Sequence, residues 1–210
     1  MLVSGSFLSN EISPKDAIKM LNKTDMDYLH VDIMDGKFVP EKTFTIKEVT
    51  EFSKYTNKSL DIHLMVKNPI KYIDDLSMLN TSYITFHYEA VKNHKEIIDK
   101  IKNNGLKAGI SIKPNTNIKE IEGLLDKLDL VLVMSVEPGK SGQAFMESVI
   151  YKLEILKKLK EEKGYRYIIN IDGGINNETF PKVKDYVDMV VSASYLLKGN
   201  AEQKVKEFKM

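Results

Sequence analysis

Histidine and aspartate side chains occur inside several apolar segments of this sequence, where an unpaired charge is costly to bury. His30 and Asp32 lie two residues apart in "YLHVDIM", His63 lies in "SLDIHLMV", and Asp172 ends "YIINID". Two imidazoles and two carboxylates form a donor set that suits a borderline divalent ion such as Zn²⁺, Mn²⁺, Fe²⁺ or Co²⁺. The residue types therefore raise the hypothesis of a metal centre.

A structural role competes with this hypothesis at each position. A lone histidine in a strand is more often a hydrogen-bonded core residue than a metal ligand. An aspartate is harder to explain in this way, because a buried carboxylate without a partner is unfavourable. Four such groups at matching depths in their segments favour one shared site.

Further titratable residues lie near the same segments. His87 is expected either to support the site from behind or to be a hydrogen-bonded core residue, and Glu137 follows another apolar segment. His94 lies in a helical pattern and is expected at the surface. Asp35 is expected to cap the turn before Gly36 rather than to join the site.

The segments that would position these side chains follow one another at a regular distance. Eight apolar runs rich in β-branched or aromatic residues predict strands, at residues 2–8, 28–34, 59–66, 82–89, 107–113, 130–136, 167–172 and 189–194. Helical signals lie between them, with a serine and a proline opening one helix and a proline inside another. The four clearest helical segments are residues 13–23, 68–79, 115–128 and 176–186.

Apolar strands alternating with helices indicate a parallel sheet covered by helices. Eight such units predict an α/β fold, a single-domain (β/α)8 TIM barrel spanning residues 1–210. A doubly wound open sheet is the competing architecture, although no GxGxxG fingerprint follows the first strand. In a barrel the carboxyl ends of all strands meet at the rim where catalysis occurs. His30 and Asp32 would then project from the same face of their strand.

A second group of residues could hold a phosphate. Glycines and small residues follow the last three predicted strands in "VEPGKSGQAF" (136–145), "IDGGI" (171–175) and "SASYL" (192–196). Such loops let backbone N–H groups approach an anion, and those after the last two strands of a barrel commonly bind phosphate. Taken alone, "DGG" is a common turn. Its position in the order of elements is what favours a phosphate site.

Composition excludes several classes of function. The 31 basic and 30 acidic residues nearly cancel, so no overall positive field would attract nucleic acid or an anionic membrane. The absence of cysteine rules out disulfides, thiol nucleophiles and thiolate metal ligands. No apolar run approaches the ~18 residues of a membrane span, and the start lacks signal-peptide features. We expect a cytoplasmic protein.

The segments that carry this chemistry also match a known family. In chain order they are "SFLS", "HVDIMDGKFVP", "DIHLMVKNP", "FHYEA", "GISIKPNT", "VMSVEPGKSGQAF", "IDGGIN" and "VSAS". They run from residue 6 to residue 194, nearly the whole chain. In these segments the sequence resembles the ribulose-phosphate 3-epimerase family, including its allulose-6-phosphate 3-epimerase branch.

The resemblance implies a (β/α)8 barrel with one divalent metal ion (Zn, Mn, Fe, Co or Mg), held by residues at positions His30, Asp32, His63 and Asp172. It also implies that Asp32 and Asp172 are the acid–base pair. Three methionines would line the reacting centre, although core packing could explain any one of them. The implied substrate-binding residues are Ser6, His30, His63, Met34, Met65, Met134, Gly139, Lys140, Ser141, Gly142, Gly173, Gly174, Ala193 and Ser194.

The sequence departs from the family pattern at a few positions. The family usually has Gly-Phe-Gly-Gly-Gln where this chain has residues 139–143, "GKSGQ". It usually has glycine at Ala193, proline at Gly5 and asparagine at Glu41. Lys140 would place a cation near the phosphate or face solvent, and Ala193 adds a methyl group to the same region. Phosphate geometry and sugar preference therefore stay open.

The resemblance predicts an isomerase, a metal-dependent 3-epimerase of a ketose phosphate. The favoured reaction interconverts D-ribulose 5-phosphate and D-xylulose 5-phosphate, a step of the pentose phosphate pathway, through a metal-stabilised 2,3-enediolate. Inversion at C3 needs one proton carrier on each face of that plane. The alternatives are a D-allulose 6-phosphate 3-epimerase, an aldolase or isomerase using the same enediolate, and a non-catalytic sugar-phosphate-binding barrel. A homo-oligomer is expected from the resemblance.

Overall fold

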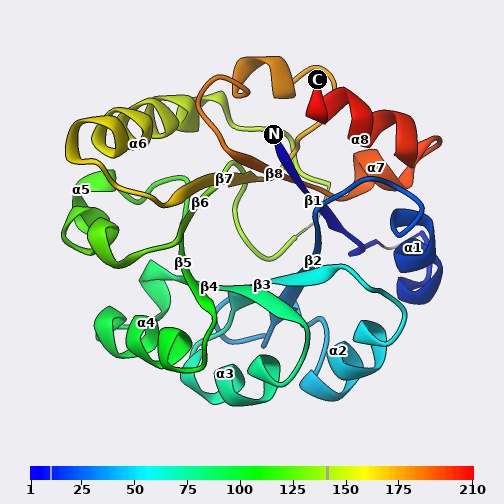
Figure 1. Cartoon of the computed structure of the whole chain (residues 1–210), viewed down its shortest axis with the longest axis horizontal. Coiled ribbons are helices and arrows are strands. Elements are labelled where there is room, and N and C mark those ends of the chain that lie inside the picture. The colour runs from blue at the N-terminus through cyan, green and yellow to red at the C-terminus, as the bar shows by residue number, and fades with distance from the viewer. Residues whose placement is uncertain (10, 141) are drawn as a thin grey trace.

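Eight parallel strands form the centre of the molecule, and they pair in chain order until the eighth meets the first (Figure 1). The structure is a computed structural model and describes residues 1–9, 11–140 and 142–210. The strands are β1 (Leu2–Ser6), β2 (Tyr28–Met34), β3 (Ser59–Met65), β4 (Thr81–His87), β5 (Lys107–Ile112), β6 (Leu130–Met134), β7 (Ile168–Asp172) and β8 (Met189–Ser192). The predicted (β/α)8 barrel is confirmed.

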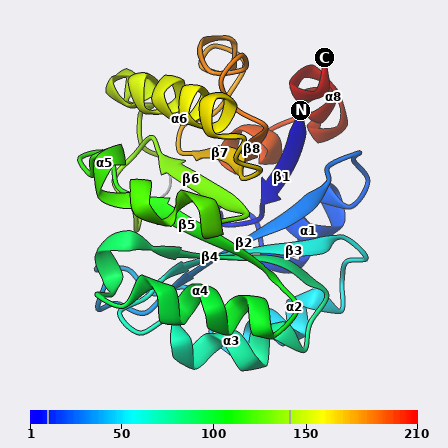
Figure 2. The same cartoon turned by 60° about the vertical axis from the view of Figure 1, so that its left-hand side comes forward.

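Helices surround the barrel on the outside (Figures 1 and 2). The α-helices are α1 (Pro14–Leu21), α2 (Ile46–Ser53), α3 (Ile70–Ser77), α4 (His94–Asn103), α5 (Ile118–Ile121), α6 (Ile150–Lys163), α7 (Ser194–Leu197) and α8 (Ala201–Lys209). Short 3₁₀ turns are η1 (Tyr88–Ala90), η2 (Glu122–Lys127), η3 (Glu147–Val149) and η4 (Phe180–Lys182). Within the described part of the chain, none of the helices is both long and apolar enough to cross a bilayer.

Local signals explain where helices begin. Ser13 caps α1 by accepting a hydrogen bond from the backbone N–H of Asp16, and Pro14 occupies the first helical position. Thr45 and Glu48 form a reciprocal capping box at the start of α2. These caps satisfy backbone N–H groups that have no partner inside the helix.

Two predicted helices are shorter than expected. Residues 176–186 form only the 3₁₀ turn η4, because the Asn176 side chain accepts hydrogen bonds from the N–H groups of Glu178 and Thr179 and stabilises a turn instead. Pro181 also lacks the N–H that a longer helix would use. Residues 115–128 are α-helical only in α5 and continue as the 3₁₀ turn η2. At the start of α3 the capping position is Pro69, which makes no side-chain cap.

The core has an outer and an inner part. Aliphatic residues on the outward faces of the strands pack against the helices in one large buried cluster. Inside the barrel, a second cluster extends up to the rim and contains Tyr83, Leu130, Leu132, Met134, Val136 and Met189. The barrel is therefore a packed core rather than a pore.

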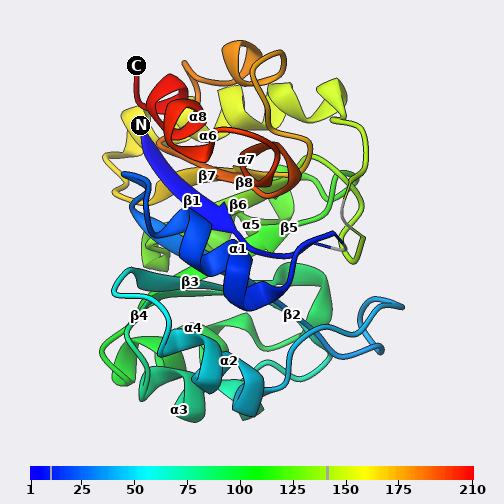
Figure 3. The same ribbon diagram turned by 90° about the vertical axis from the view of Figure 1, so that its right-hand side faces the viewer.

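The two ends of the barrel differ. Figure 3 shows the N- and C-termini at one end and the loops after β2 and β6 at the other. The second end is the one toward which all eight strands run, because they are parallel. It is the end at which barrel enzymes carry their sites.

Candidate metal and substrate site

The four predicted metal ligands meet at this rim. Asp32 on β2 is paired in register with His63 on β3, and His30 lies two residues earlier on the same face of β2. Asp172 approaches from the carboxyl end of β7. One nitrogen or oxygen atom from each residue lies within 4.8 Å of the others. Strand register therefore brings together groups from three separate parts of the sequence.

The inner atoms of this cluster can be identified from their contacts. The Asp32 Oδ1 atom lies 3.3 Å from His30 Nε2 and 3.0 Å from His63 Nδ1. The Asp172 Oδ2 atom lies 3.9 Å from each of the same two nitrogens. His30 and His63 thus turn one ring nitrogen each toward both carboxylates.

His30 is held from behind by a third carboxylate. Its outer nitrogen, Nδ1, lies 2.8 Å from Asp61 Oδ2, and the Ser4 hydroxyl donates to the same oxygen at 2.8 Å. Asp61 is the register partner of His30 on β3 and is fully buried. A histidine whose outer N–H points at a carboxylate is fixed in ring orientation and presents its inner nitrogen as a ligand.

His63 is held from behind by another histidine. Its outer nitrogen, Nε2, lies 2.9 Å from His87 Nε2, and His87 Nδ1 lies 3.2 Å from Glu89 Oε2. Burial lowers the pKa of His87 to about 4, so its ring is neutral. Burial opposes the charge of Glu89, but hydrogen bonds from His87, the Lys113 N–H and the Thr116 hydroxyl outweigh it and lower its pKa to about 2.

The two site aspartates have opposite protonation tendencies. Burial opposes ionisation of Asp32, but the charges and hydrogen bonds of His30 and His63 outweigh it and hold its pKa below the usual range. Burial and then the nearby charge of Asp32 raise the pKa of Asp172 to about 6. Burial also opposes the charge of His30, yet Asp32 and Asp61 raise its pKa well above the ordinary value. One carboxylate is thus ionised while the other holds a proton more readily.

This donor set fits a divalent metal ion. Two carboxylates whose oxygens approach this closely repel each other unless a proton or a cation lies between them. Burial first and then this repulsion raise the pKa of Asp172. Two imidazole nitrogens and two carboxylate oxygens are ligands that Zn²⁺, Mn²⁺, Fe²⁺ and Co²⁺ accept. The residues that would hold the ion are His30, Asp32, His63 and Asp172.

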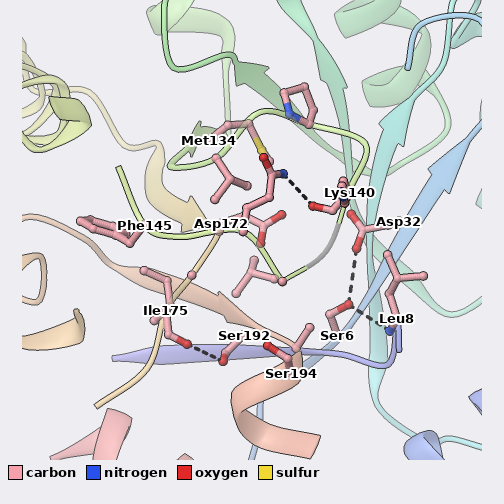
Figure 4. A pocket seen from close by; sticks show the side chains of 18 of the residues that line it. Ser6, Leu8, Asp32, Met134, Lys140, Phe145, Asp172, Ile175, Ser192 and Ser194 are labelled. Atoms are coloured by element: carbon pink, nitrogen blue, oxygen red, sulfur yellow. Dashed lines mark hydrogen bonds between the residues drawn. The ribbon is translucent and has the colours of Figure 1, made fainter. Parts of the chain in front are cut away.

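A cavity of about 480 Å³ lies above the cluster. Figure 4 shows Asp32, Asp172, Ser6 and Met134 on its walls, with the Ser6 hydroxyl donating to Asp32 Oδ2 at 3.4 Å. Its size matches a small-molecule site. The predicted substrate-binding residues that line it are Ser6, Met34, Met65, Met134, Gly139, Lys140, Gly142, Gly173, Gly174, Ala193 and Ser194.

Other predicted residues lie elsewhere. His30 and His63 are only 1% and 0% exposed and lie behind the cavity wall that Asp32 forms. Ser141 falls outside the described residues. Glu137 lines the cavity but is exposed and lies outside the metal cluster. His94 is half-buried rather than at the surface, because its ring stacks on Tyr88 with centroids 4.3 Å apart.

The turn predicted at Asp35 is present. Its Oδ1 atom accepts hydrogen bonds from the N–H groups of Lys37 and Phe38, and its Oδ2 atom accepts one from the Lys67 N–H. Gly36 has a positive φ of 69°, as the turn requires. Asp35 thus joins the loops after β2 and β3 and stays outside the metal cluster.

The loop after β7 requires its glycines. Gly173 has φ of 122°, and a Cβ atom there would lie 2.7 Å from Val136 Cγ2 and 2.9 Å from the Val136 backbone nitrogen. Gly174 has φ of 65°, and a Cβ atom there would lie 2.8 Å from the Phe145 backbone nitrogen. The loops after β6 and β7 therefore pack backbone against backbone beside the cavity, as the small residues predicted.

The positions that depart from the family pattern also lie at the cavity. Ala193 precedes α7 with φ of −114°, outside the left-handed region that favours glycine. Lys140 is exposed on the cavity wall. Lys198, which sequence reasoning missed, also lines the cavity, and its amine lies 3.4 Å from Glu11 Oε1. Lys140 and Lys198 bring positive charge to the side formed by the loops after β6 and β8.

Several supporting residues were missed by sequence reasoning. Asp61 precedes His63 by two residues, the spacing that drew attention to His30 and Asp32, so the same signal could have found it. Glu89 follows His87 at that spacing as well. Lys152 carries no such signal, because it lies in a helix rich in surface lysines, and yet it is fully buried. Asn176 and Thr179 also line the cavity.

Fold and site together define a class of protein: a (β/α)8 barrel that carries a histidine–aspartate cluster fitted to a divalent metal beneath a cavity of small-molecule size. The ribulose-phosphate 3-epimerase family model matches residues 2–197. The chain therefore belongs to the ribulose-phosphate 3-epimerase family, and the predicted resemblance is confirmed. Its members are isomerases, as the sequence predicted.

Individual relatives support the same assignment. The chain is 37% identical over 196 residues to a ribulose-phosphate 3-epimerase of Treponema pallidum, covering 92% of this chain and 90% of the relative. It is 36% identical over 204 residues to that of Bacillus subtilis, covering 96% and 94%. It is 38% identical over 210 residues to that of Methanocaldococcus jannaschii, covering 99% and 89%.

Solved structures of other proteins have a fold similar to that of this chain. A Mycobacterium tuberculosis tryptophan synthase chain superposes with a TM-score of 0.72 at 10% identity, covering 99% of this chain and 90% of that one. The tryptophan synthase α-subunit of Pyrococcus furiosus gives a TM-score of 0.70 at 16% identity, covering 99% and 96%. At these identities the likeness concerns the barrel alone.

Proposed function

We propose that this protein interconverts D-ribulose 5-phosphate and D-xylulose 5-phosphate by inverting C3, with Asp32 and Asp172 as the acid–base pair. The observation that carries the proposal is the convergence of these two carboxylates from β2 and β7 on one cluster at the cavity wall. Family membership supplies the reaction type. The contrasting environments of Asp32 and Asp172 indicate that these two residues would perform it.

Inversion requires a proton to leave one face of a planar intermediate and to return on the other. Asp32 is ionised, because the charges and hydrogen bonds of His30 and His63 hold its pKa below the usual range, and an ionised carboxylate can accept the proton. In the metal-free protein, burial and the nearby charge of Asp32 raise the pKa of Asp172 to about 6. Of the two carboxyl groups, Asp172 is therefore the one that holds a proton more readily and is suited to donate it. The roles exchange when the reaction runs in reverse.

The bound metal would supply electrostatic stabilisation for the negative charge that develops on the substrate oxygens. His30, His63 and both aspartates would hold it. The Ser6 hydroxyl, which donates to Asp32 Oδ2, orients this carboxylate and faces the cavity. Met34, Met65 and Met134 are 6%, 2% and 3% exposed and would keep water from the reacting carbon.

The phosphate group would lie between the loops after β6, β7 and β8. Gly142, Gly173, Gly174, Ala193 and Ser194 line this side of the cavity. Their backbone can approach an anion closely, and the exposed amines of Lys140 and Lys198 add positive charge. The two lysines would give this chain a cationic rim around the phosphate.

A panel of ketose 5- and 6-phosphates, assayed for C3 inversion with metal analysis of the purified protein, tests the proposal. Turnover highest with D-ribulose 5-phosphate is expected. Preference for D-allulose 6-phosphate would favour the other branch of the family with the same mechanism. Carbon–carbon cleavage or carbonyl migration would indicate different chemistry, and no proton exchange with solvent at C3 would indicate a non-catalytic binding barrel.

The remaining sequence predictions stay proposals. Residues 1–210 would act as one epimerase domain, assembled into a homo-oligomer in the cytoplasm. The expected partner is a small sugar phosphate rather than nucleic acid or membrane, in keeping with the near balance of 31 basic and 30 acidic residues.

A further inference from the structure

The two histidines of the metal cluster have different partners behind them. His30 Nδ1 faces the Asp61 carboxylate, a common arrangement around bound metals. His63 Nε2 instead faces a second imidazole, that of His87, at 2.9 Å, and His87 Nδ1 faces the Glu89 carboxylate at 3.2 Å. The outer nitrogen of His63, Nε2, is therefore linked to a carboxylate only through His87.

The chemistry of the two rings determines which atom donates in each hydrogen bond of the series His63–His87–Glu89. A metal bound at His63 Nδ1 takes the lone pair of that nitrogen, so the proton of the ring lies on Nε2. That proton must be donated to His87 Nε2, which then has no proton of its own. The proton of His87 lies on Nδ1 and is donated to Glu89, which is an acceptor when ionised. With a metal at His63 Nδ1, only this arrangement of protons gives every hydrogen bond in the series one donor and one acceptor.

The far end of the chain is anchored in the loop after β5. Glu89 Oε1 accepts hydrogen bonds from the Lys113 N–H at 2.8 Å and from the Thr116 hydroxyl. Lys152 of α6, fully buried, donates its amine protons to the carbonyls of Lys113, Pro114 and Thr116 at 3.0, 2.5 and 2.6 Å. This loop therefore cannot shift without breaking several buried hydrogen bonds, and Glu89 is held in place.

His87 itself is positioned away from substrate. It is 0% exposed and outside the cavity lining, and the Phe38 ring packs over it with centroids 4.8 Å apart. Apolar residues fill a buried packing position without the cost of burying polar groups, so a buried imidazole with a partner on each ring nitrogen points to a role toward those partners. The paired contacts of His87 thus indicate a role toward His63.

We propose that His87 and Glu89 are positioning residues that set the tautomer and ring orientation of His63 for metal binding. The inference rests on the proposed metal site and adds to it the residues that prepare one ligand. Glu89 pulls the proton of His87 to Nδ1, which leaves His87 Nε2 free to accept from His63. His63 Nδ1 is then presented to the ion with its lone pair available.

Co²⁺ and Zn²⁺ affinities, measured by competition with a chelator, test this without reference to turnover. His87→Phe keeps a ring but removes the acceptor, and we expect metal binding about 10–100-fold weaker. His87→Gln offers an amide oxygen to His63 and an N–H to Glu89, so it should restore affinity to within a few-fold of wild type. Glu89→Gln removes the carboxylate charge and should fall between them.

His94→Phe is the matched control. It replaces a half-buried histidine on α4 that lies outside the chain of contacts, and it should leave metal affinity unchanged. If His87 had only a structural role, His87→Phe would have lower thermal stability, but His87→Phe and His87→Gln would bind metal with equal affinity. If His87→Phe does not fold, His87→Gln and Glu89→Gln still carry the comparison with wild type.

Nitrogen-15 NMR of the Zn²⁺-loaded protein gives a direct readout of the tautomers. Protons on His63 Nε2 and His87 Nδ1 are expected. A proton on His87 Nε2, or a His87→Phe variant that binds Co²⁺ as tightly as wild type, would overturn the role proposed for His87 and leave the proposed metal site standing. A wild-type protein that binds neither ion would overturn the proposed metal site as well.

Discussion

At the scale of single residues, Asp32 and Asp172 carry the same carboxyl group in two different environments. His30 and His63 both contact Asp32 within hydrogen-bonding distance, whereas Asp172 lies 3.9 Å from the same nitrogens and close to the charge of Asp32. Two titratable groups whose pKa values are shifted in opposite directions are typical of an acid–base pair in an active site. The roles proposed for the two aspartates depend on this difference.

Asp172→Asn should reduce C3 inversion by at least about 10²–10⁴-fold, because the amide cannot carry the transferred proton. The fold should be spared, since asparagine has nearly the same shape and removes the repulsion from Asp32. Steady-state kinetics and thermal unfolding would measure the two effects. Asp185→Asn, an exposed position, is the control. Wild-type rates in Asp172→Asn would remove Asp172 from the acid–base pair.

The metal-free protein should become less stable, relative to Asp172→Asn, as pH rises. The pKa of Asp172 is about 6 in the folded protein against a usual 3.8, so the folded state binds this proton more tightly than the unfolded state. That contribution is present in full below the unfolded pKa and is lost as pH rises through about 6. Urea unfolding of both proteins in chelator, between about pH 4 and pH 7, would measure it.

Metal affinity should show the opposite trend. A metal must displace the proton on Asp172, so Co²⁺ binding should weaken as pH falls below about 6. Titrations across the same pH range would measure the change in affinity. An affinity that stays constant through this range would contradict the proposed protonation state of Asp172.

Residue types and spacing were enough to predict the inner residues of the site and also mark Asp61 and Glu89, but they do not show which side chains contact one another. His30 and Asp32 are recognisable because two polar residues interrupt an apolar run at strand spacing. The contacts of His30 with Asp61 and of His63 with His87 depend on strand register, which no local pattern specifies. Buried Lys152 was hidden because its helix otherwise presents lysines to solvent.

At the scale of elements, strands were easier to predict than the connections between them. The strands are largely buried on both faces and so are rich in apolar residues. Residues 176–186 carry helical signals, yet side-chain hydrogen bonds from Asn176 and Thr179 favour turns there. The spacing of apolar residues predicts a helix there, but it does not register the local side-chain hydrogen bonds that stabilise the turn.

The loop after β7 gives a prediction with a matched control. Gly173→Ala should destabilise the protein by about 1–3 kcal/mol, because its φ is 122° and its Cβ would lie 2.7 Å from Val136. Gly123→Ala meets nothing within 4 Å and should be neutral or stabilising by about 0.4–1 kcal/mol. Urea unfolding would measure both. Equal stability of the two variants would contradict the close packing of the loops after β6 and β7.

At the scale of the whole molecule, the barrel depends on a helix beyond the family match, which stops at residue 197. In α8, Val205 and Phe208 are 0% and 1% exposed, and the Phe208 ring packs against Phe180 with centroids 5.0 Å apart. Helix α8 packs against β1 and α1. The last helix therefore belongs to the core of the barrel.

Removing residues 200–210 should destabilise the protein by on the order of 3–6 kcal/mol from Val205 and Phe208 alone. That is a large share of the roughly 5–15 kcal/mol that separates a folded domain from its unfolded chain. Thermal unfolding would measure the loss. Removing only Met210, which is 95% exposed, should have no effect. A truncated protein as stable as the full chain would show that α8 is dispensable.

The pairing of β1 with β8 has a consequence for how the protein must be handled. It joins Leu2 to Met189 and Gly5 to Ser192, the first and last strands of the barrel, so it can form only when almost the entire chain is in place. Until then both strands offer unpaired backbone groups to other molecules, and aggregation competes with folding. Once the ring closes, no strand of the described barrel has a free edge. Refolding should therefore succeed at low protein concentration and fail at high concentration, while the native protein tolerates both.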